Sequence, residues 1–320
     1  MVPEFRIPGS LVIPSLSGKN MSCLIHQLPP GPVDIMGDVH GEIGAMESLI
    51  ANLGYDRLGN HPGGRKLVWV GDLTDRGPDS IAVVDKVREV VAAGNGHCVL
   101  GNHDLNLLLD HRKTENAWFY GETFRDADGS VVEQRLADDR QREKILDFFR
   151  SLPLALERAD LRIVHASWEN QMIGYARGSS DVALLYHQHA RQIRESCRES
   201  GLDSIDVGLE NQNRNPVKRI TSGPEKRIEK AYFASGKWRN EQRVPWWQDY
   251  SGPFCVFGHY AIPEGEPRPG SDAFCIDFGV GKRWKERKAG RSGGFRHRLA
   301  AFRFPEKEVV FDEPDPEGKG

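Results

Sequence analysis

Five short apolar runs in this sequence are each followed within two residues by Asp, His or Asn. Three of them, residues 33–36, 66–70 and 97–100, alternate with helical patterns, and this β-α-β-α-β order predicts parallel strands joined by right-handed crossovers. Two later runs, residues 161–164 and 254–257, end in the same kind of motif. Because open α/β sheets place ligands at the carboxyl ends of their strands, we expect these side chains to converge on one site. The motifs are G-D-V-H-G at 37–41, G-D-L-T-D-R-G at 71–77, G-N-H-D at 101–104, H-A-S at 165–167 and G-H-Y at 258–260.

The remaining residues are predicted to complete one domain around this site. Residues 1–30 carry several prolines and glycines with little periodicity, so they are interpreted as an extension. Residues 31–312 form the domain, residues 168–250 a charged insertion or cap over the site, and residues 313–320 a polar tail. Apolar periodicity predicts helices at 42–53, 78–93, 104–111, 139–150, 181–199 and 224–234, and further strands at 273–276, 298–304 and 308–311.

Composition narrows the function classes. A hydrophobic content of 38%, a charged content of 28% and a net charge of −3 predict a water-soluble globular chain with no global attraction to nucleic acid or anionic membranes. The five cysteines are scattered and never form a C-x-x-C pair, which argues against a thiolate zinc site and for a reducing compartment. Without a signal peptide or a membrane-spanning apolar run, we expect a cytoplasmic protein.

The polar side chains of the motifs form a mixed metal-ligand set. Three imidazoles, two carboxylates and one amide oxygen, with no thiolate, suit Mn, Fe, Zn or Co better than Ca or an iron–sulfur cluster. Six ligands are too many for one tetrahedral zinc ion, so the set predicts two divalent cations that share a carboxylate. We expect Mn²⁺ first, with Fe, Zn, Co, Ni or Mg as alternatives. The ligands are Asp38, His40, Asp72, Asn102, His165 and His259.

Each motif has a structural interpretation when taken alone. A single D-x-H is more often a surface turn, and a single histidine after a strand is more often packed in the core. The motif at residues 71–77 is stronger, because two acids and an arginine between glycines make a poor core. All five motifs in this order, each after an apolar run, favour a metal site.

These motifs resemble those of the calcineurin-like metallophosphoesterase superfamily, in its phosphoprotein-phosphatase-like branch. Their spacing is most similar to bacterial dinucleoside tetraphosphatases and to the phosphatase module of bacterial polynucleotide kinase-phosphatase. The resemblance covers residues 31–311, although 112–160 and 168–250 match loosely. It implies an α/β fold of the α+β sandwich type, with two packed mixed sheets, flanking helices and the metal site at the carboxyl ends of the strands.

The resemblance also implies a role for each motif residue. Asp38 and His40 would bind one metal, Asp72 would bridge, and the other three ligands would bind the second. His103 would protonate the leaving group, oriented by Asp75. The substrate phosphate would be bound by Arg76 and Asn102. An alternative for Asp75 and Arg76 is a salt bridge that ties their loop.

The implied activity is hydrolysis of a phosphate ester or anhydride by a water held between the two metals. A nucleotide-type substrate is favoured, either a dinucleoside polyphosphate or a nucleotide phosphate. Protein Ser/Thr or Tyr phosphatase activity is the alternative within this class. A non-catalytic metal-bound scaffold is the alternative outside it, although no motif residue is missing.

Several features depart from the family pattern or allow two interpretations. Bulky Trp168 follows His165 closely where the branch often has glycines. Arg243 and Arg239 are candidates for a second phosphate-binding arginine. Asp277 would either support a metal-binding histidine or form a turn.

Aromatic and basic residues outside the motifs also have two interpretations. The basic segment Lys282–Arg298 would be a solvated loop, or a clamp for polyphosphate or nucleic acid. Four aromatic residues would stack on a base or pack within the cap: Trp168, Trp246, Trp247 and Tyr260. The sequence makes no prediction of the oligomeric state.

Overall fold

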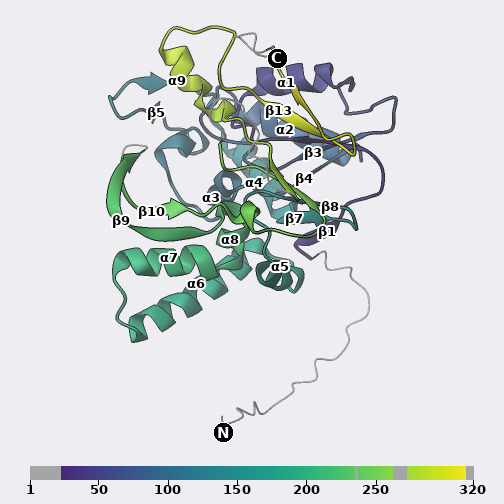
Figure 1. Ribbon diagram of the computed structural model, residues 1–320. Helices are drawn as coiled ribbons and strands as arrows, with labels where there is room; N and C mark the ends of the chain where they lie inside the picture. The colour runs from purple at the N-terminus through teal and green to yellow at the C-terminus, as the bar shows by residue number, and fades with distance from the viewer. Residues whose placement is uncertain (1–22, 235–236, 262–271, 315–320) are drawn as a thin grey trace.

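Two five-stranded sheets pack face to face (Figure 1). The computed structural model describes residues 23–234, 237–261 and 272–314. The first sheet contains β1 (Ile25–Gln27), β7 (Ala155–Glu157), β8 (Leu161–Val164), β11 (Phe254–Phe257) and β12 (Ala273–Cys275), in that order. The second contains, in order, β14 (Glu308–Phe311), β13 (Ala300–Phe304), β2 (Val33–Met36), β3 (Lys66–Trp69) and β4 (Gly96–Cys98).

Both sheets are mixed. In the second sheet β2, β3 and β4 run parallel, as the β-α-β-α-β pattern predicts, while β13 is antiparallel to β2. In the first sheet β8, β11 and β12 are parallel, and β7 is antiparallel to β8. Two separate hairpins complete the strands: β5 (Phe124–Arg125) with β6 (Val131–Val132), and β9 (Glu225–Ala234) with β10 (Lys237–Arg243).

Side chains that alternate along the strands fill the space between the sheets. Val33 and Ile35 of β2 belong to the same buried cluster as Ile163 of β8 and Val256 of β11. Met36, the next residue along β2, belongs instead to the larger cluster that includes the helices. This two-residue alternation lets one sheet face pack on the other sheet and the opposite face pack on helices.

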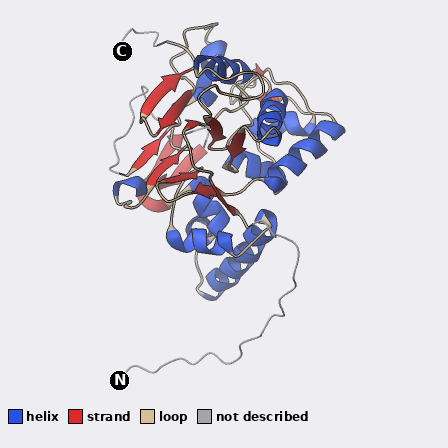
Figure 2. Ribbon diagram, turned by 90° about the vertical axis from the view of Figure 1, so that its right-hand side faces the viewer, coloured by secondary structure: helices blue, strands red, loops and turns tan. Residues whose placement is uncertain are grey.

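Helices cover the outer faces of the sheets. α1 contacts β14, α2 contacts β4, and α5 contacts β1. A second group, α6, α7 and α8, packs on itself below the strands, and the β9–β10 hairpin curves over α7 (Figures 1 and 2). Within the described part of the chain, no helix is long and apolar enough to cross a membrane. The helices are α1 (Ile43–Asn52), α2 (Ser80–Ala92), α3 (Asn102–Leu108), α4 (Asp139–Ser151), α5 (Asn170–Arg177), α6 (Val182–Glu199), α7 (Ser204–Arg214), α8 (Pro216–Ser222) and α9 (Arg283–Lys288), with short 3-10 helices η1 (Thr114–Tyr120), η2 (Trp246–Gln248) and η4 (Val280–Lys282).

The predicted fold class is confirmed, and so are most of the predicted elements. Strands β2, β8, β11 and β14 have the predicted bounds. Helix α2 begins two residues later than Pro78, because the Asp79 carboxylate accepts the backbone N–H of Ala82 at 2.8 Å and caps the helix there.

Two sequence predictions differ from the structure. The predicted helix over residues 224–234 is wrong, since β9 occupies 225–234 and pairs antiparallel with β10. Glu, Lys and Ala favour helix locally, but pairing with β10 overrides this preference. The structure also places β1, within the predicted extension 1–30, in the first sheet beside β7.

Phe302 of β13 packs across the interface between the two sheets. Its ring centroid lies 5.5 Å from that of Phe254 and 4.7 Å from that of Phe274, and the residue is 2% exposed. We expect Phe302→Ala to lower the free energy of unfolding by about 3–5 kcal/mol, because it leaves a cavity between the sheets. Urea unfolding measures this change. The control Leu184→Ala, at an exposed position on α6, should change it by less than about 0.5 kcal/mol. Equal effects would contradict the assigned packing.

Candidate functional site

The ends of five strands bring the predicted polar side chains to one place. Asp38 and Asp72 follow β2 and β3, and α3 begins at Asn102 after β4. His165 follows β8 and His259 follows β11, so ligands come from both sheets. The site therefore lies where the two sheets meet, and Asp38, Asp72 and His165 are buried there.

The backbone at these strand ends is left-handed at non-glycine residues. Positive φ values of 48° at His40, 49° at Asp72, 76° at Asp75, 67° at Arg76 and 70° at His259 occur in the loops of three motifs. Each such residue costs of order 1–3 kcal/mol and persists where the surrounding packing leaves no alternative. The fold thus holds these side chains in positions that a relaxed loop would not keep.

Two glycines let these loops approach one another. A Cβ at Gly258 would overlap a carboxylate oxygen of Asp38, and a Cβ at Gly101 would overlap the backbone nitrogen of Asp72. Glycine is therefore required at both positions to keep the two carboxylates where they are.

Backbone carbonyls orient two of the imidazoles. Nδ1 of His40 donates to the carbonyl of Thr74 at 3.0 Å, and Nδ1 of His165 donates to the carbonyl of Val70 at 2.8 Å. A neutral ring that carries its proton on Nδ1 has a lone pair on Nε2. This is how proteins orient histidines that bind metals.

The lone pairs face other acceptor atoms. Nε2 of His40 accepts from Arg76 at 3.0 Å and also lies 3.7 Å from Oδ2 of Asp72 and 3.9 Å from Oδ2 of Asp38. Nε2 of His165 lies 3.4 Å from Oδ1 of Asp72 and 3.1 Å from Oδ1 of Asn102. Lone pairs that face one another repel unless a proton or a metal cation lies between them. This geometry fits metal binding.

The possible metal donors fall into two groups that share Asp72. The donor atoms of each group lie within 4.8 Å of one another. Nδ1 of His259 also lies 2.8 Å from Oδ1 of Asn102, which places the amide oxygen beside the second group. The donor set therefore fits two divalent cations. The groups are His40, Asp72 and His103, and Asp72, His165 and His259.

The electrostatics of the buried carboxylates and His165 also favour a bound cation. Burial raises the pKa of the Asp38 carboxyl well above its usual range, and the neighbouring Asp277 and Asp72 carboxylates raise it further. Burial opposes protonation of His165, but the Asp72 and Asp38 carboxylates raise its pKa to about 10. The buried carboxylates thus create a negative potential that favours a cation.

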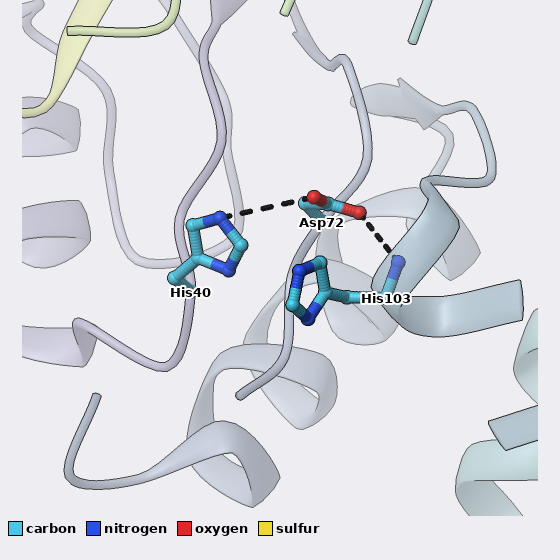
Figure 3. Close-up of side chains that lie close together, drawn as sticks. All are labelled: His40, Asp72 and His103. Atoms are coloured by element: carbon cyan, nitrogen blue, oxygen red, sulfur yellow. Dashed lines mark hydrogen bonds and ion pairs between the residues drawn. The ribbon is translucent and has the colours of Figure 1, made fainter. Parts of the chain in front are cut away.

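His103, a member of the first group, lies beside His40 and Asp72 (Figure 3) and is also held by Asp75. Its Nδ1 is 2.6 Å from Oδ2 of Asp75, whose Oδ1 accepts the indole N–H of Trp118 at 2.8 Å. Its backbone N–H donates to Oδ1 of Asp72 at 2.8 Å. Burial and the Arg76 guanidinium act to lower the pKa of His103, but the Asp72 and Asp75 carboxylates offset them and raise it. The imidazole is therefore suited to donate a proton.

Arg76 links the two histidines of this part of the site. Its two terminal nitrogens donate to Nε2 of His40 and Nε2 of His103, each at 3.0 Å, and its Nε donates to Glu115 at 3.1 Å. Glu115 and Trp118 are not predicted from the sequence, because both lie in the segment 112–140, which carries no motif. Only their position in η1, opposite the arginine and Asp75, reveals them.

A cleft of about 490 Å³ opens over these groups. Of the two candidate arginines, Arg243 lines the cleft and donates to the carbonyl of His259 at 2.9 Å. Arg239 does not line it and pairs with Glu241 at 3.3 Å. Asp277 lines it as well, and its Oδ1 accepts the backbone N–H of Gly279 at 2.8 Å, which fits the turn-forming interpretation.

The four aromatic candidates mostly serve packing. Trp247 and Tyr260 line the cleft, but they are 3% and 6% exposed and pack on each other with ring centroids 4.7 Å apart. Trp168 and Trp246 line a different hollow, and the Trp246 indole donates to the carbonyl of Ala166 at 2.7 Å. These contacts favour packing over stacking on a base.

Comparison with known proteins decides the family. The family described as calcineurin-like phosphoesterase matches residues 31–278, more than half of the chain. The chain belongs to this family. The resemblance inferred from the motifs is therefore confirmed, and with it phosphoesterase chemistry and the use of divalent metal ions.

Similar proteins extend the match across most of the chain. The protein named bis(5'-nucleosyl)-tetraphosphatase PrpE [asymmetrical] from Anoxybacillus flavithermus is 32% identical over 87% of this chain and 92% of its own length. Its namesake from a Geobacillus species is 33% identical with the same coverage. One solved structure, whose description assigns it as a diadenosine tetraphosphatase, shares the fold with a TM-score of 0.51. The two chains are 19% identical, and the match covers 91% of this chain and 97% of that one.

The close approach at Gly258 predicts the effect of a single methyl group. We expect Gly258→Ala to displace the Asp38 carboxylate, lowering stability by about 1–3 kcal/mol and turnover by at least ~10-fold. The matched control is Gly174→Ala in α5, where a Cβ would meet no atom within 4 Å. That change should leave turnover unaltered and stability unchanged or up to ~1 kcal/mol higher. Thermal unfolding, bound-metal analysis and initial rates measure the difference; wild-type behaviour of Gly258→Ala would contradict the assigned packing.

Proposed function

We propose that this phosphoesterase cleaves one phosphoanhydride bond of a dinucleoside polyphosphate, asymmetrically, with two divalent cations bound. The observation that carries the proposal is similarity over nearly the whole chain to proteins named for that reaction, at 32–33% identity. The geometry of the cleft supports it, because metal donors, a proton donor and an arginine face the same space.

The metal positions follow from the two donor groups. Bound cations would lower the pKa of a water molecule and neutralise charge on the phosphate oxygens. Because the donors are nitrogen and oxygen without thiolate, we propose Mn²⁺ as the preferred ion. Asp72 would contact both cations. The other ligands would be Asp38 and His40 for one, and Asn102, His165 and His259 for the second.

Arg76 would bind the phosphate group that is attacked. Its planar guanidinium reaches between His40 and His103 and can donate to two phosphate oxygens at once. The Glu115 carboxylate on Nε would keep the guanidinium in the cleft and set its plane. The amide of Asn102, which also lines the cleft, would contact the same phosphate.

His103 would protonate the leaving oxygen. Its Nδ1 is tied to Asp75, so its Nε2 is the atom that reaches the cleft. Arg76 donates to this Nε2 in the substrate-free geometry, so the imidazole would first take up a proton there, which its raised pKa favours, and then act as a general acid. In this assignment His103 does not bind a metal, although its ring atoms lie close enough to the first group.

The cap and the compartment belong to the same proposal. Residues 168–250 supply Arg243 and Trp247 to the cleft wall, which supports their role as a cap on one domain spanning residues 31–312. The five cysteines, all in the described part of the chain, are unpaired, which supports a cytoplasmic location.

Metal replacement tests the reaction and the substrate class. We expect metal-stripped protein to be inactive and Mn²⁺ to restore hydrolysis of diadenosine tetraphosphate. Asp72→Asn should stay at least ~100-fold lower, because Asp72 belongs to both donor groups. The panel would also hold p-nitrophenyl phosphate, bis-p-nitrophenyl phosphate and a phosphopeptide. Preference for the phosphopeptide would favour a protein phosphatase. Silence across the panel with metal bound would favour a non-catalytic scaffold.

The leaving group tests the role of His103. We expect His103→Ala to retain both metals and to lose ~10²–10⁴-fold in the rate of diadenosine tetraphosphate hydrolysis. The loss should be smaller for p-nitrophenyl phosphate, whose leaving group needs no proton. His187→Ala, which changes an exposed histidine of α6, is the control and should behave as wild type. Loss of bound metal from His103→Ala would instead make His103 a ligand.

A further inference from the structure

Two cations face the cleft without an acidic partner. Arg243 and Lys282 both line it, and neither forms an ion pair with a described Asp or Glu. Arg243 is held by a neutral group, the carbonyl of His259, and its guanidinium lies 5.4 Å from the centre of the Tyr260 ring. Arg76, by contrast, is already paired with Glu115.

The position of Lys282 is built into the fold. Gly279 is left-handed, with φ of 78°, and a Cβ at Gly281 would overlap the ring of His40. The turn η4 thus packs directly on a predicted metal ligand and ends at Lys282. The next residue, Arg283, is buried and anchors the turn by pairing with Asp312 at 2.8 Å.

The rest of the basic segment is engaged elsewhere. Arg287 forms an ion pair with Glu42, Lys288 pairs with Asp126 at 3.0 Å, and Arg291 pairs with the segment's own Glu286 at 3.3 Å. These pairs leave the segment poorly suited to act as a continuous clamp for nucleic acid. They single out Lys282 as the residue of this segment that lines the cleft.

The charge balance indicates the ligand. Divalent cations at the two donor groups would offset Asp38 and Asp72, and Glu115 offsets Arg76. Arg243 and Lys282 then share the cleft with one further carboxylate, Asp277, which forms no ion pair with either, so net positive charge remains. Partial burial lowers the pKa of Lys282, the Asp277 carboxylate opposes this and neighbouring cations reinforce it, so an anion bound there gains from meeting the lysine charge. A single phosphate on the metals would leave this charge unmet, whereas a chain of phosphates would extend to it.

We propose that Lys282 and Arg243 bind the phosphates of the substrate that lie beyond the hydrolysed bond, so that the site selects phosphoanhydride chains over single phosphate esters. This assignment rests on the proposed hydrolysis of a dinucleoside polyphosphate. It makes both residues specificity determinants of that reaction and gives the nucleoside itself a smaller part in recognition, in keeping with the buried Trp247 and Tyr260.

Calorimetry with inorganic ligands tests the proposal without relying on turnover. Protein loaded with Mn²⁺ would be titrated with tripolyphosphate and with orthophosphate at a fixed free Mn²⁺ concentration. We expect wild type to bind tripolyphosphate at least ~10-fold more tightly. Lys282→Ala and Arg243→Ala should each weaken tripolyphosphate about 10-fold, the effect of losing one charge-assisted hydrogen bond, and weaken orthophosphate much less.

Matched variants separate chain binding from other causes. Lys282→Arg should keep most of the tripolyphosphate affinity. Lys285→Ala removes a cation three residues away that lies over the Trp284 ring, and it should bind as wild type. Equal weakening of both ligands, or no weakening of either, would overturn the proposal. The proposal would also be overturned if wild type bound a single-stranded oligonucleotide more tightly than tripolyphosphate and Lys285→Ala lost that binding. Failure to hydrolyse diadenosine tetraphosphate, with tripolyphosphate binding as expected, would overturn the proposed function and retain the phosphate-chain site.

Discussion

Buried negative charge at the junction of the two sheets is the constraint on which the rest of the structure depends. Asp38 and Asp72 are each 2% exposed, and carboxylates removed from water are costly unless opposite charge meets them. Without metal, protonated His165 would offset part of this charge, whereas burial and neighbouring cations hold the pKa values of His40 and His259 well below their usual range. Bound divalent cations would replace the His165 proton and offset more of the charge. Metal binding is thus expected to stabilise the folded chain as well as supply chemistry.

The sandwich keeps this charge cluster assembled. Loops that end in left-handed residues such as Asp72 and Asp75 would relax if they were isolated, because that backbone conformation is unfavourable for them. They remain because glycines let each loop rest on another, as Gly101 does on Asp72, and because the strands behind them are locked by the packing between the sheets. The close packing between the sheets therefore makes it possible for the loops of the site to keep an unfavourable backbone conformation.

Features that depend on residues close together in the sequence could be predicted, and features that depend on distant residues could not. Strands such as β2 and β11 are short apolar runs, and their polar residues meet because parallel strands end at one edge of a sheet. The β9–β10 hairpin could not be predicted from the composition of residues 225–234, because pairing with residues 237–243 decides it. Glu115 was missed for the same reason. It lies 39 residues from Arg76, in a segment whose path depends on the surrounding packing.

The difference between local and distant interactions also explains why the sequence predicts the reaction class better than the substrate. The groups that would perform the chemistry follow strand ends, so short motifs in the sequence specify them. The groups that would set substrate preference come from less regular segments. Arg243 lines the cleft from the end of a hairpin strand, Lys282 lines it from a 3-10 turn that packs on His40, and Glu115 of η1 pairs with Arg76. Their positions depend on tertiary packing and leave little local signal in the sequence. Substrate preference in a fold of this kind is therefore a property of these segments, and it can change while the metal-binding centre stays the same.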